Sequence, residues 1–327
     1  MYIGKVEING YAALAPMAGV ADRAMREICT QHGCAFTVGE LTSAKGVVLG
    51  DRKSASLLQA EASFRPFASQ IFGCEPEIMA QAAKKACEYS PDFLDINMGC
   101  PAPKVAVSGG GGSALMKDPR LAQRIVEQVV AAVKVPVTVK MRTGWNDREL
   151  TAVELAKRCE QAGAAAITVH GRTRSQMFAD PVDYETIARV KQAVDIPVIA
   201  NGNITDGKTA ELVYEQTGCD FIMVGRGAMG RPWVFEQINA WMEQGVSLPE
   251  PPLSKRLSIM VEQIERMVSY KGEKIAFSEA RKHTAWYMRG FRNAAELRRM
   301  CAGISCMEDV FEICRAAQRL GCEEQTD

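Results

Sequence analysis

The sequence predicts an α/β protein in which a (β/α)8 TIM barrel is followed by a small C-terminal helical bundle. Two patterns carry this prediction. Between Ala12 and Val224, short apolar runs alternate with amphipathic stretches, and eight such runs occur. After Ser254 the strand signals stop and only helical periodicity remains. Strand–helix alternation indicates parallel strands joined by right-handed crossovers, and eight units favour a closed barrel over an open sheet.

The eight predicted strands are short and are bounded by polar or glycine-rich turns. They are Ala12–Ala15, Phe36–Val38, Pro66–Ile71, Phe93–Ile96, Val135–Val139, Ala165–Val169, Ile196–Ala200 and Phe221–Val224. Among the helices between them, Pro119–Val133 has the clearest start, because Asp118 suits an N-cap and proline suits the first helical position. Thr151–Gln161 ends before Gly163, a suitable C-cap, and Val182–Val194 precedes the seventh strand.

The pattern changes at Gly245–Ser254, where several prolines indicate a linker. The helices predicted beyond it are Leu253–Tyr270, Ser278–Gly290, Ala294–Ala302 and Met307–Leu320. The predicted organisation is therefore a barrel domain at residues 1–244, a linker at 245–254 and a helical domain at 255–327.

The composition narrows the class of protein. Hydrophobic residues make up 47% of the chain, and 39 Lys+Arg balance 39 Asp+Glu, so net charge does not indicate a nucleic-acid or membrane partner. The 11 cysteines form no CxxC pair, which argues against a zinc site or a disulfide framework and suits a reducing compartment. No signal-peptide core and no apolar run of about 18 residues is found, so we expect a cytoplasmic protein with neither membrane nor metal.

Polar or glycine-rich residues follow seven of the eight predicted strands. In a (β/α)8 barrel the carboxyl ends of the strands meet at one mouth, where active sites lie. In strand order the residues are Pro16-Met17-Ala18-Gly19, Gln70, Asn97 with Cys100, Lys140 with Arg142, His170 with Arg172, Asn201-Gly202-Asn203, and Gly225-Arg226-Gly227. Their convergence predicts an active site at this mouth.

The last two turns, 201–203 and 225–227, predict a phosphate site. Loops at these places in such barrels often hold phosphate by backbone N–H groups, and Arg226 adds a guanidinium. The alternative is a pair of ordinary left-handed turns. Lys140 would form a Schiff base, stabilise an anionic cofactor ring, or simply lie at the rim. Beside these groups, His170 is expected to contact a ligand rather than to be a satisfied rim histidine.

The segment from Asn97 to Pro101 runs from the fourth strand into a tight turn that carries the thiol of Cys100. A cysteine inside a strand is usually a small buried hydrophobe, whereas one on a turn at a strand end can be presented to a ligand. The run Gly109–Gly112 follows closely. It would let the thiol-bearing loop close over a substrate, or it is a plain surface turn.

The C-terminal segment is locally basic and aromatic. Its basic residues are Arg266, Lys271, Lys274, Arg281, Lys282, Arg289, Arg292, Arg298 and Arg299, interleaved with Tyr270, Phe277, Trp286, Tyr287 and Phe291. These types suit an RNA backbone and exposed bases, but in an arbitrary bundle a solvated face over an aromatic core is the better interpretation. Arg23 and Arg26, on the helix after the first strand, are also expected on a solvated face.

Several segments together resemble the tRNA-dihydrouridine synthases, from about Ile3 to the C-terminal helices. They are Ala15-Pro16-Met17-Ala18-Gly19-Val20-Ala21-Asp22, Asp95-Ile96-Asn97-Met98-Gly99-Cys100-Pro101, Val139-Lys140-Met141-Arg142-Thr143-Gly144-Trp145, His170-Gly171-Arg172-Thr173-Arg174 and Gly225-Arg226-Gly227-Ala228-Met229-Gly230-Arg231-Pro232-Trp233. The Asn-Met-Gly-Cys-Pro turn is the most specific, whereas the glycine–arginine turn is shared among flavin barrels. Ala280-Arg281-Lys282-His283 with Trp286-Tyr287 looks most like the bacterial B type.

The resemblance implies an FMN enzyme that uses NADPH to reduce the C5=C6 bond of uridine in the D-loop of tRNA. It implies that Cys100 is the proton donor, and that the basic helical domain binds the tRNA. We expect a monomer. The implied cofactor-binding residues are Pro16, Met17 and Ala18 behind the isoalloxazine, Gln70 and Lys140 at its polar edge, His170 between ring and phosphate, and Asn201, Gly202, Asn203, Gly225 and Arg226 at the phosphate. The implied substrate-binding residues are Asn97, Arg142 and Arg172.

Two features depart from the family pattern: Asn203 stands where the family commonly has Asp, and Gly109–Gly112 is unusually rich in glycine. Three alternatives remain open. The first is an FMN barrel acting on a free pyrimidine or small enone, in the manner of dihydroorotate dehydrogenases. The others are an RNA-binding protein with a vestigial barrel and a Schiff-base aldolase that uses Lys140.

Overall fold

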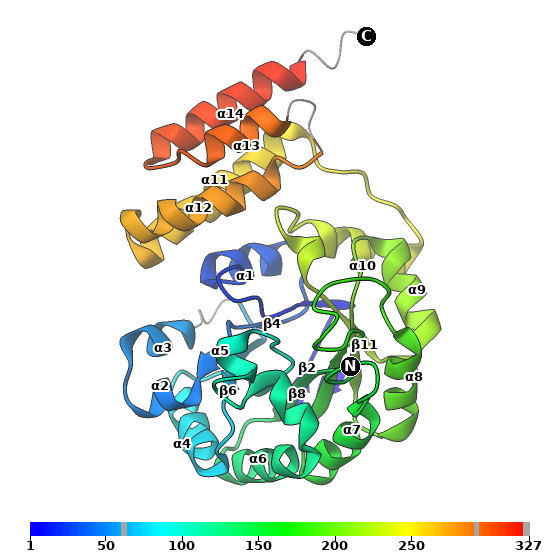
Figure 1. Cartoon of the computed structure of the whole chain (residues 1–327). Coiled ribbons are helices and arrows are strands. Elements are labelled where there is room, and N and C mark those ends of the chain that lie inside the picture. The colour runs from blue at the N-terminus through cyan, green and yellow to red at the C-terminus, as the bar shows by residue number, and fades with distance from the viewer. Residues whose placement is uncertain (60–63, 291–293, 323–327) are drawn as a thin grey trace.

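The computed structural model describes residues 1–59, 64–290 and 294–322. Figure 1 shows a barrel of strands surrounded by helices, with the C-terminal helices stacked together on one side. Phe291 and Arg292 of the predicted basic and aromatic set, and residues 323–327 of the predicted helical domain, lie outside the described residues. None of the helices in the described ranges combines the length and apolarity needed to cross a membrane.

Eight parallel strands close the barrel, as the sequence predicts. They are β3 (Ala12–Leu14), β4 (Thr37–Val38), β6 (Phe67–Phe72), β7 (Phe93–Met98), β8 (Val137–Arg142), β9 (Ala166–His170), β10 (Val198–Asn201) and β11 (Phe221–Val224). Consecutive strands pair, β4 pairs with β6, and β11 returns to pair with β3. The short β5 (Thr42–Ser43) pairs with β6, and β1 (Tyr2–Ile3) forms a hairpin with β2 (Val6–Glu7).

Several strands begin and end later than predicted. Pro66, Pro136 and Pro197 each immediately precede the first residue of a strand, because a proline has no N–H to donate to the sheet. At their carboxyl ends, β7 to β10 also run further than predicted. β7 includes Asn97, and β8, β9 and β10 end at Arg142, His170 and Asn201 respectively. Some of the predicted site residues, including Asn97, Lys140, Arg142, His170 and Asn201, are therefore held by the sheet itself.

Aromatic side chains fill the amino-terminal end of the barrel. The ring of Phe36 lies 5.3 Å from that of Phe93 and 5.7 Å from that of Phe221. Ile3 and Ile8, from the hairpin segment, belong to the same buried cluster. This end is a packed apolar core, so polar chemistry is confined to the opposite mouth.

Helices form the outer layer of the barrel, as the amphipathic stretches predict. The longer ones are α1 (Arg23–Gln31), α4 (Pro76–Cys87), α6 (Pro119–Ala132), α7 (Ala152–Gln161), α8 (Tyr184–Ala193), α9 (Gly207–Thr217) and α10 (Val234–Gln244). Shorter ones are α2 (Ala44–Val48), α3 (Arg52–Leu57), α5 (Pro103–Ala106), η1 (Gly112–Lys117) and η2 (Arg226–Ala228). Asp118 caps α6 as predicted, because its carboxylate accepts the N–H of Leu121 at 3.0 Å.

The C-terminal helices are α11 (Leu253–Lys271), α12 (Glu273–Tyr287), α13 (Ala294–Cys301) and α14 (Met307–Cys322). Their apolar faces form one buried cluster, which also contains Ala24 and Ile28 of α1 and the indole of Trp233. Figure 1 shows α1 between the barrel and these helices. The helical region is thus packed against the barrel through shared apolar surface.

Buried carboxylates on α1 and at its N-cap face the helical region. Lys271 contacts the carboxylate of Asp22 at 2.5 Å, and Arg266 contacts Glu27 at 3.1 Å. Burial alone would raise the pKa of Asp22, but Lys271 and other favourable contacts outweigh burial and hold that pKa below 3.8. The expectation of a solvated face was wrong for Arg26, which is 5% exposed and donates to the carbonyls of Ala21 and Gln59.

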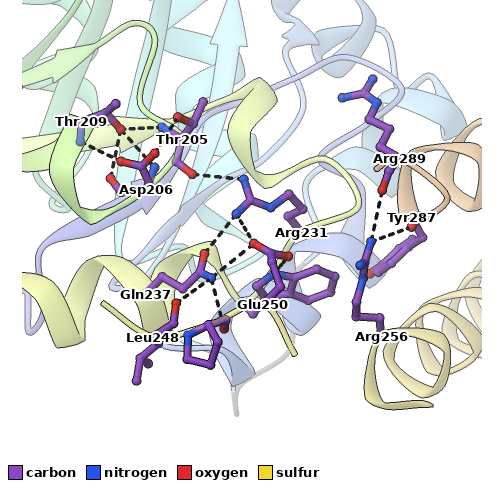
Figure 2. A network of polar contacts seen from close by, with 12 residues as sticks. Thr205, Asp206, Thr209, Arg231, Gln237, Leu248, Glu250, Arg256, Tyr287 and Arg289 are labelled. Atoms are coloured by element: carbon purple, nitrogen blue, oxygen red, sulfur yellow. Dashed lines mark hydrogen bonds and ion pairs between the residues drawn. The ribbon is translucent and has the colours of Figure 1, made fainter. Parts of the chain in front are cut away.

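Figure 2 shows how the segment between α10 and α11 is fastened. Glu250 lies in this segment and accepts hydrogen bonds from Arg231 and, at 2.8 Å, from the indole of Trp233. Arg256 of α11 donates to the carbonyls of Tyr287 and Arg289 at 3.3 and 3.2 Å. These contacts hold the end of α12 in place, and in Figure 2 the guanidinium of Arg289 points away from Arg256.

We predict that Lys271→Met destabilises the protein by about 2–3 kcal/mol, because it leaves the Asp22 carboxylate buried without its cationic partner. Chemical denaturation measures the free energy of unfolding. Lys274→Met is the control, because Lys274 is exposed on the neighbouring helix. Equal stabilities of the two variants would show that the ion pair does not hold the interface.

Candidate active site

A cavity of about 780 Å³ opens at the carboxyl ends of the barrel strands. All but one of the predicted site residues line it: Pro16, Met17, Ala18, Asn97, Cys100, Lys140, Arg142, His170, Arg172, Asn201, Gly202, Asn203, Gly225 and Arg226. The exception is Gln70, which is fully buried and absent from the cavity wall. Its predicted contact with a flavin stays a prediction.

Strand register places the polar side chains of the wall on neighbouring strands at two successive levels. Asn97 of β7 pairs with Lys140 of β8, and Arg142 of β8 pairs with His170 of β9. His170 in turn pairs with Asn201 of β10. Because side chains alternate between the two faces of a strand, this register decides which of them enter the barrel.

The turn that carries Cys100 is fixed from both sides. The side-chain oxygen of Asn97 accepts the N–H groups of Gly99 and Cys100 at 3.1 and 2.9 Å, and the carbonyl of Cys100 accepts the N–H of Ser113 at 3.1 Å. Burial raises the pKa of the Cys100 thiol, although Ala102 and Arg142 act in the opposite direction. The group is therefore held as a neutral thiol at neutral pH.

The glycine run packs against this turn. Gly112 has a φ of +54°, and a Cβ there would lie 2.9 Å from the carbonyl oxygen of Cys100. A Cβ on Gly111 would lie 3.1 Å from the carbonyl oxygen of Gly73. Gly111 and Gly112 are buried and permit close backbone approach behind the thiol, whereas Gly109 is exposed, so only the first part of the run lies at the surface; closure of this loop over a substrate stays a prediction.

Arg142 ties the thiol turn to the loop after β9. Its Nε donates to the carbonyl of Gly99 at 2.8 Å, and its Nη1 donates to the carbonyls of Thr173 and Met177 at 2.9 and 2.8 Å. The side chain is buried. Arg142 thus lines the cavity while most of its donors hold backbone in place.

Lys140 is half-buried beside Asn201, to whose side-chain oxygen it donates at 3.1 Å. Burial and the neighbouring Arg142 lower the pKa of Lys140 to about 8, against the favourable charge of Asp95. The amine is close to its titration point at physiological pH. This suits both functional roles predicted for it, stabilisation of an anion and nucleophilic attack.

Burial and four cations lower the pKa of His170 well below 6.5, so the ring is neutral. The cations are Lys140, Arg142, Arg172 and Arg226. Nη1 of Arg172 lies 3.3 Å from Nε2 of His170, so Nε2 accepts and the ring proton is assigned to Nδ1. The cavity wall is therefore strongly positive and suits an anionic ligand.

Arg172 and Asn203 are joined through Asp180. Arg172 is 1% exposed and donates to Asp180 at 2.7 Å and to Asn203 at 2.8 Å. Asn203 also donates to Asp180 at 2.6 Å, and its φ of +49° is one that asparagine tolerates. A carboxylate from the loop after β9 therefore lies beside the amide of Asn203.

The two glycine turns lie against each other at the far side of the cavity. A Cβ on Gly227 would lie 2.3 Å from the carbonyl oxygen of Ile204, so the two backbones touch there. Gly202 has a φ of +145°. The arrangement leaves backbone and the Arg226 side chain facing the cavity, as a phosphate site requires.

Sequence reasoning missed several residues of the wall, and three of them, Met177, Phe178 and Arg289, bear on its chemistry. Met177 and Phe178 are 42% and 51% exposed at the cavity, and the ring of Phe178 lies beneath the guanidinium groups of both Arg142 and Arg226. Arg289 reaches the same cavity from the end of α12. An apolar pair in a polar loop was a visible signal, whereas nothing in the sequence places Arg289 near the barrel mouth.

We predict that Gly227→Ala lowers the free energy of unfolding by about 2 kcal/mol, because a methyl group would overlap the carbonyl of Ile204. Gly225→Ala is the matched control in the same turn, since its nearest neighbours would be 3.8 Å or more away. Denaturant titration of both variants checks this. Equal losses would show that the two turns are not in close contact.

Comparisons with known proteins identify the family of the chain. The model of the family "Dihydrouridine synthase (Dus)" matches residues 13–322. A "Probable tRNA-dihydrouridine synthase" of Rickettsia bellii is 42% identical over 314 residues, covering 95% of this chain and 94% of that protein. "tRNA-dihydrouridine synthase B" of Pseudomonas aeruginosa is 40% identical over 325 residues, covering 99% and 97%.

Among solved structures, morphinone reductase in complex with tetrahydroNAD superposes with a TM-score of 0.53 and 15% identity, covering 78% of this chain and 92% of that one. That likeness concerns the barrel fold alone. The family match and the two relatives span nearly the whole chain and confirm the resemblance seen in the sequence. This chain belongs to the dihydrouridine synthase family.

Proposed function

We propose that this protein reduces the C5=C6 bond of uridine in the D-loop of tRNA to 5,6-dihydrouridine, with FMN as cofactor and NADPH as reductant. The observation that carries the proposal is the thiol of Cys100, held on a hydrogen-bonded turn in the wall of a cationic barrel mouth. The family and the names of its relatives support the substrate.

The residues of the mouth fit FMN. Two abutting glycine turns with Arg226 suit its phosphate, and Pro16, Met17 and Ala18 offer an apolar wall for its ring. Lys140 would hold negative charge at the polar edge of the ring, and the Nδ1–H of His170 would donate to the ligand. Bound FMN supplies the hydride that C6 of uracil receives.

Cys100 supplies the proton. As its S–H bond breaks, a C–H bond forms at C5 of the uracil, and the thiolate that remains is stabilised by nearby Arg142. Burial keeps the sulfur protonated until that step. Asn97, Arg142 and Arg172 are proposed to bind the uracil, with Arg172 acting through the His170 and Asn203 side chains that it contacts.

The helical region is proposed to bind the tRNA. Lys274, Arg281, Arg298 and Arg299 are exposed and available to phosphates, whereas Arg266 and Lys271 are used in ion pairs with the barrel. Arg289 lines the cavity itself. An enzyme that acts on a free pyrimidine would not need a side chain of the helical region in its active-site wall. The position of Arg289 therefore favours tRNA over a free pyrimidine as the substrate.

We predict that Cys100→Ala lowers the rate of dihydrouridine formation by about 100-fold or more, because the proton donor is lost. The assay incubates the purified holoenzyme with NADPH and unmodified tRNA and measures dihydrouridine in a nucleoside digest. Cys87→Ala is the control, since Cys87 is also half-buried but lies on α4. Full activity of Cys100→Ala would refute the role of the thiol, and no product from the unmodified protein would refute the function.

We predict that affinity for FMN falls by about tenfold as the pH rises from 7 to 9, a change equal to 1.4 kcal/mol. The protonated amine attracts the ligand, and its charge is lost as the pH passes through the pKa of Lys140, about 8. Quenching of FMN fluorescence gives the dissociation constant at each pH. The same slope in Lys140→Met would assign the pH dependence to another group.

A further inference from the structure

A chain of buried hydrogen bonds runs inside the barrel to the turn of Cys100. Thr138 and Gln70 donate to the two carboxylate oxygens of Asp95 at 2.6 and 2.7 Å. Asn97 donates to the side-chain oxygen of Gln70 at 2.9 Å. The oxygen of Asn97 then accepts the N–H groups that begin the turn of Cys100. Asp95, at 3% exposed, ends this chain.

The chain has one direction, and Asp95 sets it. Burial raises the pKa of Asp95, while the hydrogen bonds from Gln70 and Thr138 and the charge of Lys140 act in the opposite direction. An ionised carboxylate can only accept, so it requires the NH₂ group of Gln70 to face it. The oxygen of Gln70 must then face Asn97, which turns the NH₂ group of Asn97 inward and its oxygen toward the N–H of Cys100. If the side-chain amide of Gln70 or of Asn97 were reversed, its NH₂ group would face another buried N–H donor, and neither would have an acceptor.

We propose that Asp95 is a positioning residue, which orients Gln70 and Asn97 so that the latter holds the turn of Cys100. The inference rests on the proposed function of that thiol. Asp95 has no atom on the cavity wall, so it acts through the two amides rather than on a ligand. Its position two residues before Asn97 on β7 places it deeper in the barrel, beneath the reacting groups.

The decisive variant is Asp95→Leu, which removes the acceptor and fills the site with an apolar side chain. In the holoenzyme at saturating FMN we expect reoxidation by tRNA to be slowed ~10–100-fold, as when an orienting partner is lost. We also expect iodoacetamide to alkylate Cys100 at least about threefold faster, because the loosened turn exposes the thiol. Mass spectrometry of the Cys100 peptide measures that rate without any catalysis.

Two conservative variants separate the effect of the hydrogen-bond direction from the effect of the negative charge on Asp95. In Asp95→Asn, the new amide can turn its NH₂ group toward the hydroxyl of Thr138, which can also accept, and its oxygen toward Gln70. Gln70 then keeps its acceptor. The rates of Cys100 alkylation and of reoxidation by tRNA should therefore stay within about threefold of normal. Thr138→Val removes a donor but leaves the amides oriented, so it should behave likewise. Asp95→Asn as impaired as Asp95→Leu would overturn the proposal in favour of the charge, and an equally impaired Thr138→Val would indicate general packing.

Normal alkylation and normal reoxidation in Asp95→Leu would also overturn the proposal. If that variant does not fold, Gln70→Met carries the test, because it breaks the next link of the same chain and should likewise speed the alkylation of Cys100. An unmodified holoenzyme that makes no dihydrouridine would refute the proposed function, whereas the alkylation rates still decide whether Asp95 positions the thiol.

Discussion

The register of the parallel strands is the constraint on which the site depends. Pairing sets Asn97 beside Lys140 and Arg142 beside His170. A slip of one residue in any strand would turn its polar side chains out of the barrel and its apolar ones into the mouth. The packed phenylalanines at the opposite end oppose such a slip in β7 and β11, because Phe93 and Phe221 would then lose their contacts with Phe36. The apolar end of the barrel therefore helps to fix the register at the polar end.

Charge gives this mouth its chemical character. Lys140, Arg142, Arg172 and Arg226 surround the ring of His170, and the carboxylates near them are Asp95 deeper in the barrel and Asp180 at the rim. The excess of positive charge suits an anionic ligand. Burial and the same field keep the ring of His170 neutral, so the histidine offers a directed hydrogen bond rather than a further charge.

The fold and most of the cavity wall could be predicted because they follow from local patterns. Apolar runs mark the strands, and the residues after them meet at one mouth wherever such a barrel closes. What could not be predicted depends on contacts between distant segments. Arg26 looked solvated from the sequence, but it donates to the carbonyl of Gln59, and its helix packs against the C-terminal helices. No spacing in the sequence reveals these contacts. Likewise, Gly112 became a packing residue only once Val105 and Cys100 lay against it.

Asp22 has a consequence for how the two parts of the molecule act together. This residue ends the loop that carries Met17 and Ala18, and it is also where Lys271 attaches the helical region. One short stretch of backbone therefore serves both as cavity wall and as anchor. An interaction that fixes this stretch of backbone from one side therefore also constrains the side chains on its other side.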